Sequence, residues 1–93
     1  MIISFEALAD LERLRRFLRV KNPRAAKAAA DMIVQSLQGL ELFPEMGRPL
    51  EAQSGGIREL VIRFGRDGCV AKYRYDGTVV FVLAIKHYRE ESY

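Results

Sequence analysis

The segment from residue 70 to residue 87 decides the fold; its sequence is VAKYRY (70–75), DG (76–77) and TVVFVLAIKH (78–87). The two flanking runs are rich in β-branched and aromatic residues, which favour strands. Asp-Gly between such runs is the dipeptide that most strongly indicates a two-residue hairpin turn. A type I′ turn places Tyr75 opposite Thr78, and the pairs that follow end with Val70 opposite Leu83. We therefore predict an antiparallel hairpin with this register.

This register sorts the hairpin side chains onto two faces, because residues that pair across antiparallel strands share a face. One face is small and apolar, as expected beneath helices, and carries Cys69, Ala71, Tyr73, Tyr75, Thr78, Val80, Val82 and Ala84. The other mixes cations with large apolar side chains, namely Val70, Lys72, Arg74, Val79, Phe81, Leu83, Ile85 and His87. A mixed face of this kind indicates contact with something polar or acidic. It is the predicted functional surface.

The first half of the chain predicts a short strand and a helical hairpin. Residues 1–4 are mostly apolar and must pair with a later strand, because a helix follows them. In residues 5–20 apolar side chains recur at helical spacing, and Ser4 is available as N-cap. Asn22-Pro23 then supplies an N-cap and a first-turn proline. The second helix carries an apolar stripe through Ala26, Ala29, Ala30, Ile33, Val34, Leu37 and Leu40.

The second half predicts a long loop and a three-stranded meander. Residues 45–56 form the loop, in which Gly47-Arg48-Pro49 is typical of a turn and Arg48 is expected to pair with a carboxylate. Residues 57–64 alternate as a strand, residues 65–68 are its turn, and the hairpin follows. The last strand is apolar on both faces, so we expect a neighbour on each side, the first strand being one.

These elements form one α+β domain, residues 1–93, with the helical hairpin packed on one face of a four-stranded, mostly antiparallel sheet. A single cysteine and a single histidine exclude an internal disulfide and a Cys/His metal cluster, and no cofactor is expected. The longest apolar run is too short to span a bilayer, and the N-terminus is acidic where a signal peptide is basic. We expect a cytoplasmic protein without membrane contact.

The charge is unevenly distributed. A net charge of +3 and a pI near 9.3 permit binding to nucleic acid or to an acidic protein. One basic block holds seven cations and no acid: Arg13, Arg15, Arg16, Arg19, Lys21, Arg24 and Lys27. Cations near the C-terminus of a helix complement its dipole and keep its outer face soluble. A docking surface is the alternative explanation for this block.

Three motifs in this order carry a family resemblance: FPEMGRP (43–49), RELV (58–61) and HYREESY (87–93). Together with the element order, they resemble the RelE/ParE toxin superfamily over essentially the whole chain. The first and last motifs are similar to the ParE side, the plasmid-stabilisation toxins. This resemblance implies a toxin neutralised by a cognate antitoxin. It further implies inhibition of DNA gyrase for ParE-like members and cleavage of mRNA in the ribosome for RelE-like members.

Cutting RNA requires an acid or base and a cation that holds the phosphate. In RelE-like nucleases these come from an arginine early in the penultimate strand, an arginine just after the last strand and a tyrosine near the C-terminus. The matching positions are Val70, His87 and Tyr93, and valine can do no such chemistry. Lys72 and Arg74 could hold phosphate instead, and imidazole titrates near neutral pH. The catalytic candidates are therefore His87, Arg74, Lys72 and Tyr93, although His87 is equally explained as a strand-end residue bonded to a carbonyl.

The resulting expectation is a type II toxin that inhibits a protein target, with DNA gyrase as that target. An mRNA endonuclease and a degenerate, inactive toxin are the alternatives. The chain alone is not expected to bind DNA sequence-specifically. The residues expected to bind antitoxin or target are Arg58, Lys72, Arg74, Phe81, Lys86, His87, Tyr88 and Arg89, and the secondary basic patch comprises Arg13, Arg16, Arg19, Lys21, Arg24 and Lys27.

Overall fold

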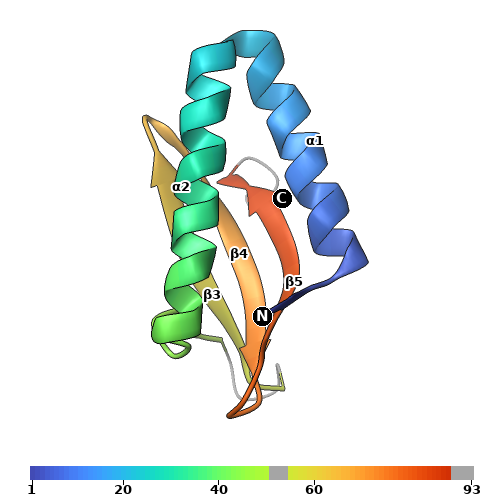
Figure 1. The fold of residues 1–93 in the computed structure, drawn as a ribbon, viewed down its shortest axis with the longest axis vertical. Coiled ribbons are helices and arrows are strands. Elements are labelled where there is room, and N and C mark those ends of the chain that lie inside the picture. Colours follow the sequence, from blue (N-terminus) through green and yellow to red (C-terminus); the bar gives the residue numbers. More distant parts are fainter. Residues whose placement is uncertain (51–54, 89–93) are drawn as a thin grey trace.

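The structure is a computed structural model that describes residues 1–50 and 55–88. The elements are β1 (Ile2–Ile3), α1 (Phe5–Lys21), α2 (Pro23–Leu42), β2 (Arg48–Pro49), β3 (Ile57–Phe64), β4 (Asp67–Tyr75) and β5 (Val80–His87). They form a sheet in the order β1-β5-β4-β3-β2, in which β1 runs parallel to β5 and the other pairs are antiparallel (Figure 1). The predicted α+β architecture is confirmed. The short edge strand β2 is an addition to it.

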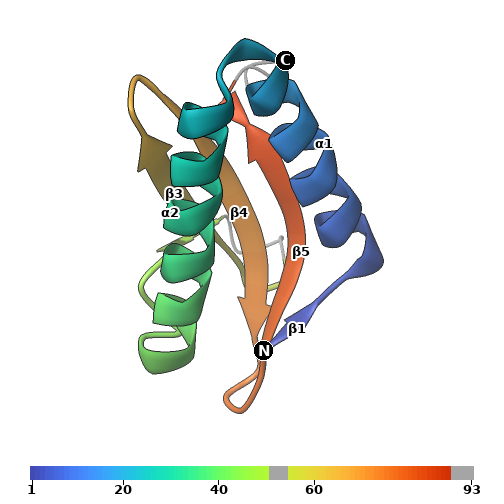
Figure 2. The ribbon, with the colours of Figure 1, turned by 45° about the horizontal axis from the view of Figure 1, so that its top comes forward.

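Both helices begin where the sequence predicts, because their caps are local. The Ser4 Oγ accepts the N–H of Ala7 at 3.0 Å. Asn22 ends α1 through its backbone N–H, which donates to Leu18 O, and its side chain caps α2 by accepting the N–H groups of Arg24 and Ala25. A single residue therefore joins the two helices, which lie antiparallel over the sheet (Figure 2).

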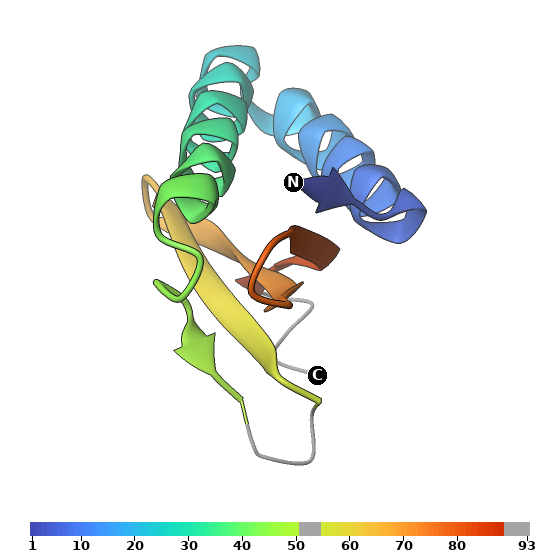
Figure 3. The ribbon, with the colours of Figure 1, turned by 60° about the horizontal axis from the view of Figure 1, so that its bottom comes forward.

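The helices cover one face of the sheet, and the core lies between the two layers (Figure 3). Tyr73 and Val82 are fully buried there, and Val80 is only 4% exposed, as predicted for the face under the helices. The core cluster also includes Ile33 and Leu40 of α2. We call the opposite side of the sheet the open face. Neither helix in the described part of the chain is long and apolar enough to cross a membrane.

The predicted register of the β4–β5 hairpin is wrong by two residues. Tyr75 pairs with Val80, so the loop spans four residues, 76–79, instead of two. The carboxylate of Asp76 accepts hydrogen bonds from the N–H groups of Thr78 at 2.8 Å and Val79 at 2.7 Å. These bonds provide acceptors for two backbone N–H groups of the wider loop. These two hydrogen bonds lower the pKa of Asp76. A two-residue shift keeps each side chain on its predicted face.

A β-bulge in β5 then reverses the face of the sheet on which the following side chains lie. Tyr73 pairs with Val82 but Lys72 pairs with Ala84, so Leu83 is an extra residue. Beyond it, Ile85 and His87 turn toward the helices, whereas Ala84 moves to the open face. The predicted placement of these three residues is therefore wrong. The two-residue turn of this sheet lies between β3 and β4 instead, at Gly65-Arg66, where Gly65 has a φ of 62°.

Candidate functional site

The open face brings together three of the predicted binding residues. Arg74 pairs with Phe81, and Lys72 lies two residues along β4, so all three share this face. Arg74 is exposed, while Lys72 and Phe81 are half-buried. Val61 of β3 is 48% exposed on the same face. The surface thus combines cations with apolar contact area.

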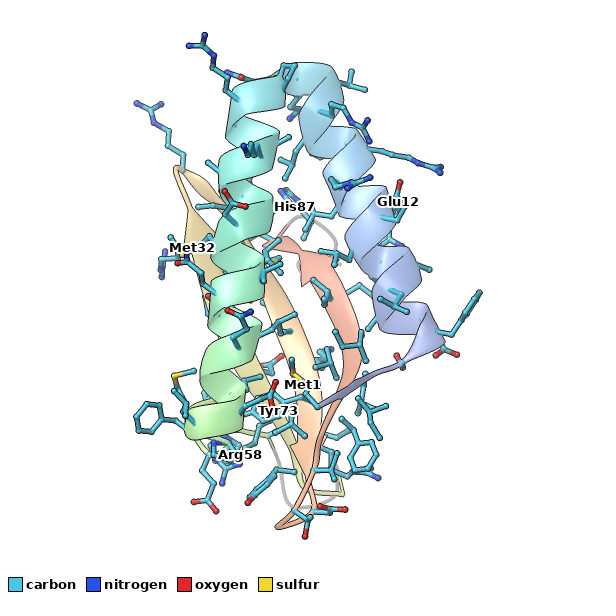
Figure 4. The ribbon with its side chains drawn as sticks, viewed as in Figure 1. Met1, Glu12, Met32, Arg58, Tyr73 and His87 are labelled. Atoms are coloured by element: carbon cyan, nitrogen blue, oxygen red, sulfur yellow. The ribbon has the colours of Figure 1, made fainter. Side chains whose placement is uncertain are left out.

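His87 does not belong to this surface, and its predicted position there is wrong. It pairs with Cys69 on the helix side of the sheet and is only 4% exposed. Its ring lies 5.4 Å from that of Phe17, and its Nε2 lies 2.5 Å from Asp67 Oδ1. Figure 4 shows His87 in the space between α1 and α2, near the end of β5. A histidine in this position supports packing and is shielded from a substrate on the open face.

The ring of Tyr88 packs directly against the backbone of Gly68 in the neighbouring strand β4. A Cβ atom added at Gly68 would collide with the Tyr88 ring, so only glycine leaves the ring its place. The Tyr88 hydroxyl is buried. This geometry gives Tyr88 a packing role at the end of β5. Arg89 and Tyr93, the other predicted residues of this region, lie outside the described residues.

Arg58 is engaged in a clamp on the loop after α2. Its Nη1 donates to the carbonyl oxygens of Glu45 at 3.1 Å and Gly47 at 2.9 Å. Tyr73 completes the clamp, because its hydroxyl donates to Pro44 O at 2.8 Å and accepts the Gly47 N–H at 2.8 Å. Figure 4 shows Tyr73 and Arg58 near the C-terminal end of α2. The predicted binding residue Arg58 therefore fixes a loop within the chain.

The same loop carries an ion pair that the sequence indicated and an exposed apolar cluster that it did not. Arg48 pairs with Glu59 at 2.7 Å, as predicted. The predicted turn at Gly47-Arg48-Pro49 is wrong, because Arg48 and Pro49 pair with β3 as strand β2. Leu42, Phe43 and Met46 are exposed there and border a cavity of about 510 Å³ that Pro44, Glu45 and Tyr75 also line. The clamp holds these apolar side chains in place, and a rigid surface loses less entropy on binding.

A buried carboxylate, Asp10, was missed as a structural centre. It is 4% exposed, and its Oδ2 accepts the N–H of Ile85 at 3.0 Å. Its Oδ1 accepts from Lys86 Nζ at 3.0 Å and from Arg13 Nη1 at 2.9 Å. Burial raises the pKa of Asp10, but these three hydrogen bonds outweigh it, so the pKa is lowered. Lys86, a predicted binding residue, is thereby tied to α1.

The single cysteine is chemically inert. Burial, with a smaller effect from the charge of Asp67, raises the pKa of the Cys69 thiol to about 12. The thiolate, which is the nucleophilic form, is therefore negligible at neutral pH. Among residues 1–50 and 55–88 no group of three or more His, Cys, Asp or Glu side chains could hold a metal ion.

Comparison with known proteins assigns this chain to a family. The family model described as "ParE toxin of type II toxin-antitoxin system, parDE" matches residues 1–92. The chain belongs to this toxin family. Toxin RelE3 of Caulobacter vibrioides is 36% identical over 81 residues, which cover 87% of this chain and 85% of the relative. Toxin RelE1 of the same organism is 32% identical over 91 residues, which cover 98% of this chain and 95% of the relative.

Among the described residues of this ParE-family toxin, neither of the two positions that match RelE-like catalytic arginines offers a group for RNA cleavage on the open face. Val70 has an apolar side chain and is only 9% exposed. His87 faces the helices because of the bulge at Leu83. Lys72 and Arg74 remain on the open face as cations that can attract an anionic partner.

Proposed function

We propose that this toxin acts by binding and inhibiting a protein, DNA gyrase, and not by cutting RNA. The burial of His87 carries the proposal. A general acid or base must come within hydrogen-bond reach of the reacting group, and His87 is enclosed by Phe17, Asp67 and the sheet. The described open face offers cations and apolar area instead, a combination suited to binding. Gyrase as the target follows from the ParE-like motifs, and it fits the cytoplasmic location that the sequence predicts.

Two assays on the full-length chain separate the two modes of action. In a supercoiling assay we expect loss of gyrase activity as the toxin is added. In primer extension on mRNA under translation we expect no new 5′ ends, because positions 70 and 87 present no catalytic group on the open face. New 5′ ends together with unaffected supercoiling would refute the proposal. Expression without growth arrest would instead indicate an inactive toxin.

The family further implies a cognate antitoxin, and we propose that it binds the open face around Lys72, Arg74 and Phe81. An amphipathic, acidic segment suits this face, because apolar anchors supply affinity while opposite charge steers association. A small adjacent gene whose product copurifies with the toxin is the expected companion.

Reversing one charge on the open face tests this assignment. We expect Arg74→Glu to weaken antitoxin binding at least ~10-fold, which corresponds to ~1.4 kcal/mol, and to slow association most at low salt. Arg24→Glu is the matched control, because Arg24 is also exposed but lies at the start of α2. Titration calorimetry and stopped-flow association measure the two effects. Equal losses in both variants would exclude a specific role of the open face.

A further inference from the structure

A basic groove lies between the two helices, away from the open face. It has a volume of about 260 Å³ and is lined by Arg15, Arg19, Pro23, Ala26, Lys27 and Ala30. Three of its side chains are cations and none is an acid. Figure 4 shows nitrogen-tipped side chains gathered around the joined ends of α1 and α2. The groove is thus the centre of the basic block that the sequence contains.

The nearby acids neutralise only the early part of this block. Glu12 pairs with Arg15 at 3.4 Å and with Arg16 at 3.3 Å, and Asp10 pairs with Arg13. In the described part of the chain, Arg19, Arg24 and Lys27 enter no ion pair. The positive charge therefore remains uncompensated where α1 passes into α2.

The helix dipole explains the cations at the end of α1 but not those at the start of α2. Arg19 and Lys21 stand in the last turn of α1, where cations complement the negative end of the helix dipole. In contrast, the first turn of α2 holds Arg24 and no acid, and Lys27 follows about one turn later. Cations at the positive end of a helix reduce its stability. A bound anion would reverse this penalty, because cations and the helix N-terminus would both attract it.

The apolar residues that line the groove distinguish among three kinds of anionic partner: a single-stranded nucleic acid, a peptide and a duplex. Pro23, Ala26 and Ala30 are small, so the lining offers no aromatic platform on which unpaired bases could stack. It also contains no large apolar side chain that could act as an anchor in a protein interface. Arginine, in contrast, suits phosphate because its planar group donates two parallel hydrogen bonds. Cations along a groove without aromatic or large apolar side chains therefore fit the backbone of a duplex better than a single strand or a peptide.

We propose that this groove binds the phosphate backbone of duplex DNA, without reading its sequence, while the toxin is engaged with gyrase. The choice of DNA rests on the proposed function, because gyrase acts on duplex DNA and a toxin bound to the enzyme near that duplex would meet its phosphates. The contact is separate from the open face, so antitoxin and DNA occupy different surfaces. Phosphate contacts add affinity and position the protein.

Fluorescence anisotropy of the full-length chain with a labelled 20-bp duplex of arbitrary sequence tests the groove without gyrase. For Arg19→Gln with Lys27→Gln we expect ~10-fold weaker binding, and a plot of log K against log salt whose slope is smaller by ~2, since each lost phosphate contact removes ~0.9. The control, Arg48→Gln with Arg63→Gln, removes the same charge from β2 and β3 and should change binding less than about 2-fold. Equal losses in the two variants would overturn the proposal.

Further measurements distinguish duplex DNA from other anionic partners. Duplex RNA bound more tightly than duplex DNA would overturn the assignment to DNA, and poly-glutamate bound as tightly as DNA would overturn the assignment to phosphate. In the supercoiling assay the groove variant should be a weaker inhibitor than the control variant. Inhibition that is unchanged in the groove variant would overturn this inference and leave the proposed function intact. Duplex binding without any inhibition would overturn the proposed function.

Discussion

Asp10→Ala is expected to lower the free energy of unfolding by about 3 kcal/mol. The carboxylate of Asp10 is enclosed between α1 and β5, where it accepts the backbone N–H of Ile85 and the charged groups of Lys86 and Arg13. Alanine leaves the buried N–H of Ile85 without its acceptor. Lys86 and Arg13 lose less, because their side chains are 37% and 49% exposed and can be hydrated.

Urea unfolding followed by circular dichroism measures this loss. Asp31→Ala is the matched control, since Asp31 is also an aspartate within a helix but is exposed on α2. We expect the control to change stability by less than about 0.5 kcal/mol. The slope of free energy against urea should be unchanged in both variants, because neither changes the area buried. Identical midpoints for the two variants would show that Asp10 contributes nothing beyond its exposed counterpart.

The pH dependence provides a second measure of the same group. Because the folded chain lowers the pKa of Asp10, the group binds protons more weakly when folded than when unfolded. Its contribution is therefore fully present above the unfolded pKa of about 3.9 and is lost as the pH falls through the lowered folded value. We expect the wild-type chain to lose more stability than Asp10→Ala below about pH 4.

The parts of the fold that the sequence predicted are those set by local interactions. Ser4 and Asn22-Pro23 define the helix starts through hydrogen bonds to residues two or three positions away. Residues 57–64 place Leu60, Ile62 and Phe64 on one face, and the structure confirms β3 over that whole range. Local patterns of this kind need no knowledge of what packs against them, and so the two helices and the strands other than β2 were predicted closely.

The misplaced parts depend on partners far away in the sequence or on one extra residue. Asp10 was missed because its decisive partner, Ile85, lies 75 residues away. Asp76-Gly77 predicted a two-residue turn, but the Asp76 side chain stabilises a four-residue loop. The bulge at Leu83 then turned His87 from the open face to the helix side. Burial of His87 beside Phe17 follows from that one residue.

The loop clamp gives the second large effect: Gly47→Ala is expected to lower the free energy of unfolding by about 3 kcal/mol. A Cβ at residue 47 would lie 2.6 Å from the ring and hydroxyl of Tyr73 and 2.8 Å from the carbonyl oxygen of Glu59. Tyr73 is fully buried and Glu59 contributes backbone, so neither can move away at low cost. Displacing the Tyr73 hydroxyl would also break its hydrogen bonds to Gly47 and Pro44.

Gly39→Ala is the matched control, with an effect of opposite sign. Gly39 lies within α2, and a Cβ there would meet only the Met46 Cε at 3.6 Å, an ordinary contact. Alanine favours a helix interior over glycine by about 1 kcal/mol, so this variant should be more stable than the wild-type chain. Chemical unfolding of both variants measures the contrast. If Gly47→Ala proved as stable as Gly39→Ala, the loop after α2 would have to adjust freely, and the clamp formed by Tyr73 and Arg58 would not hold it.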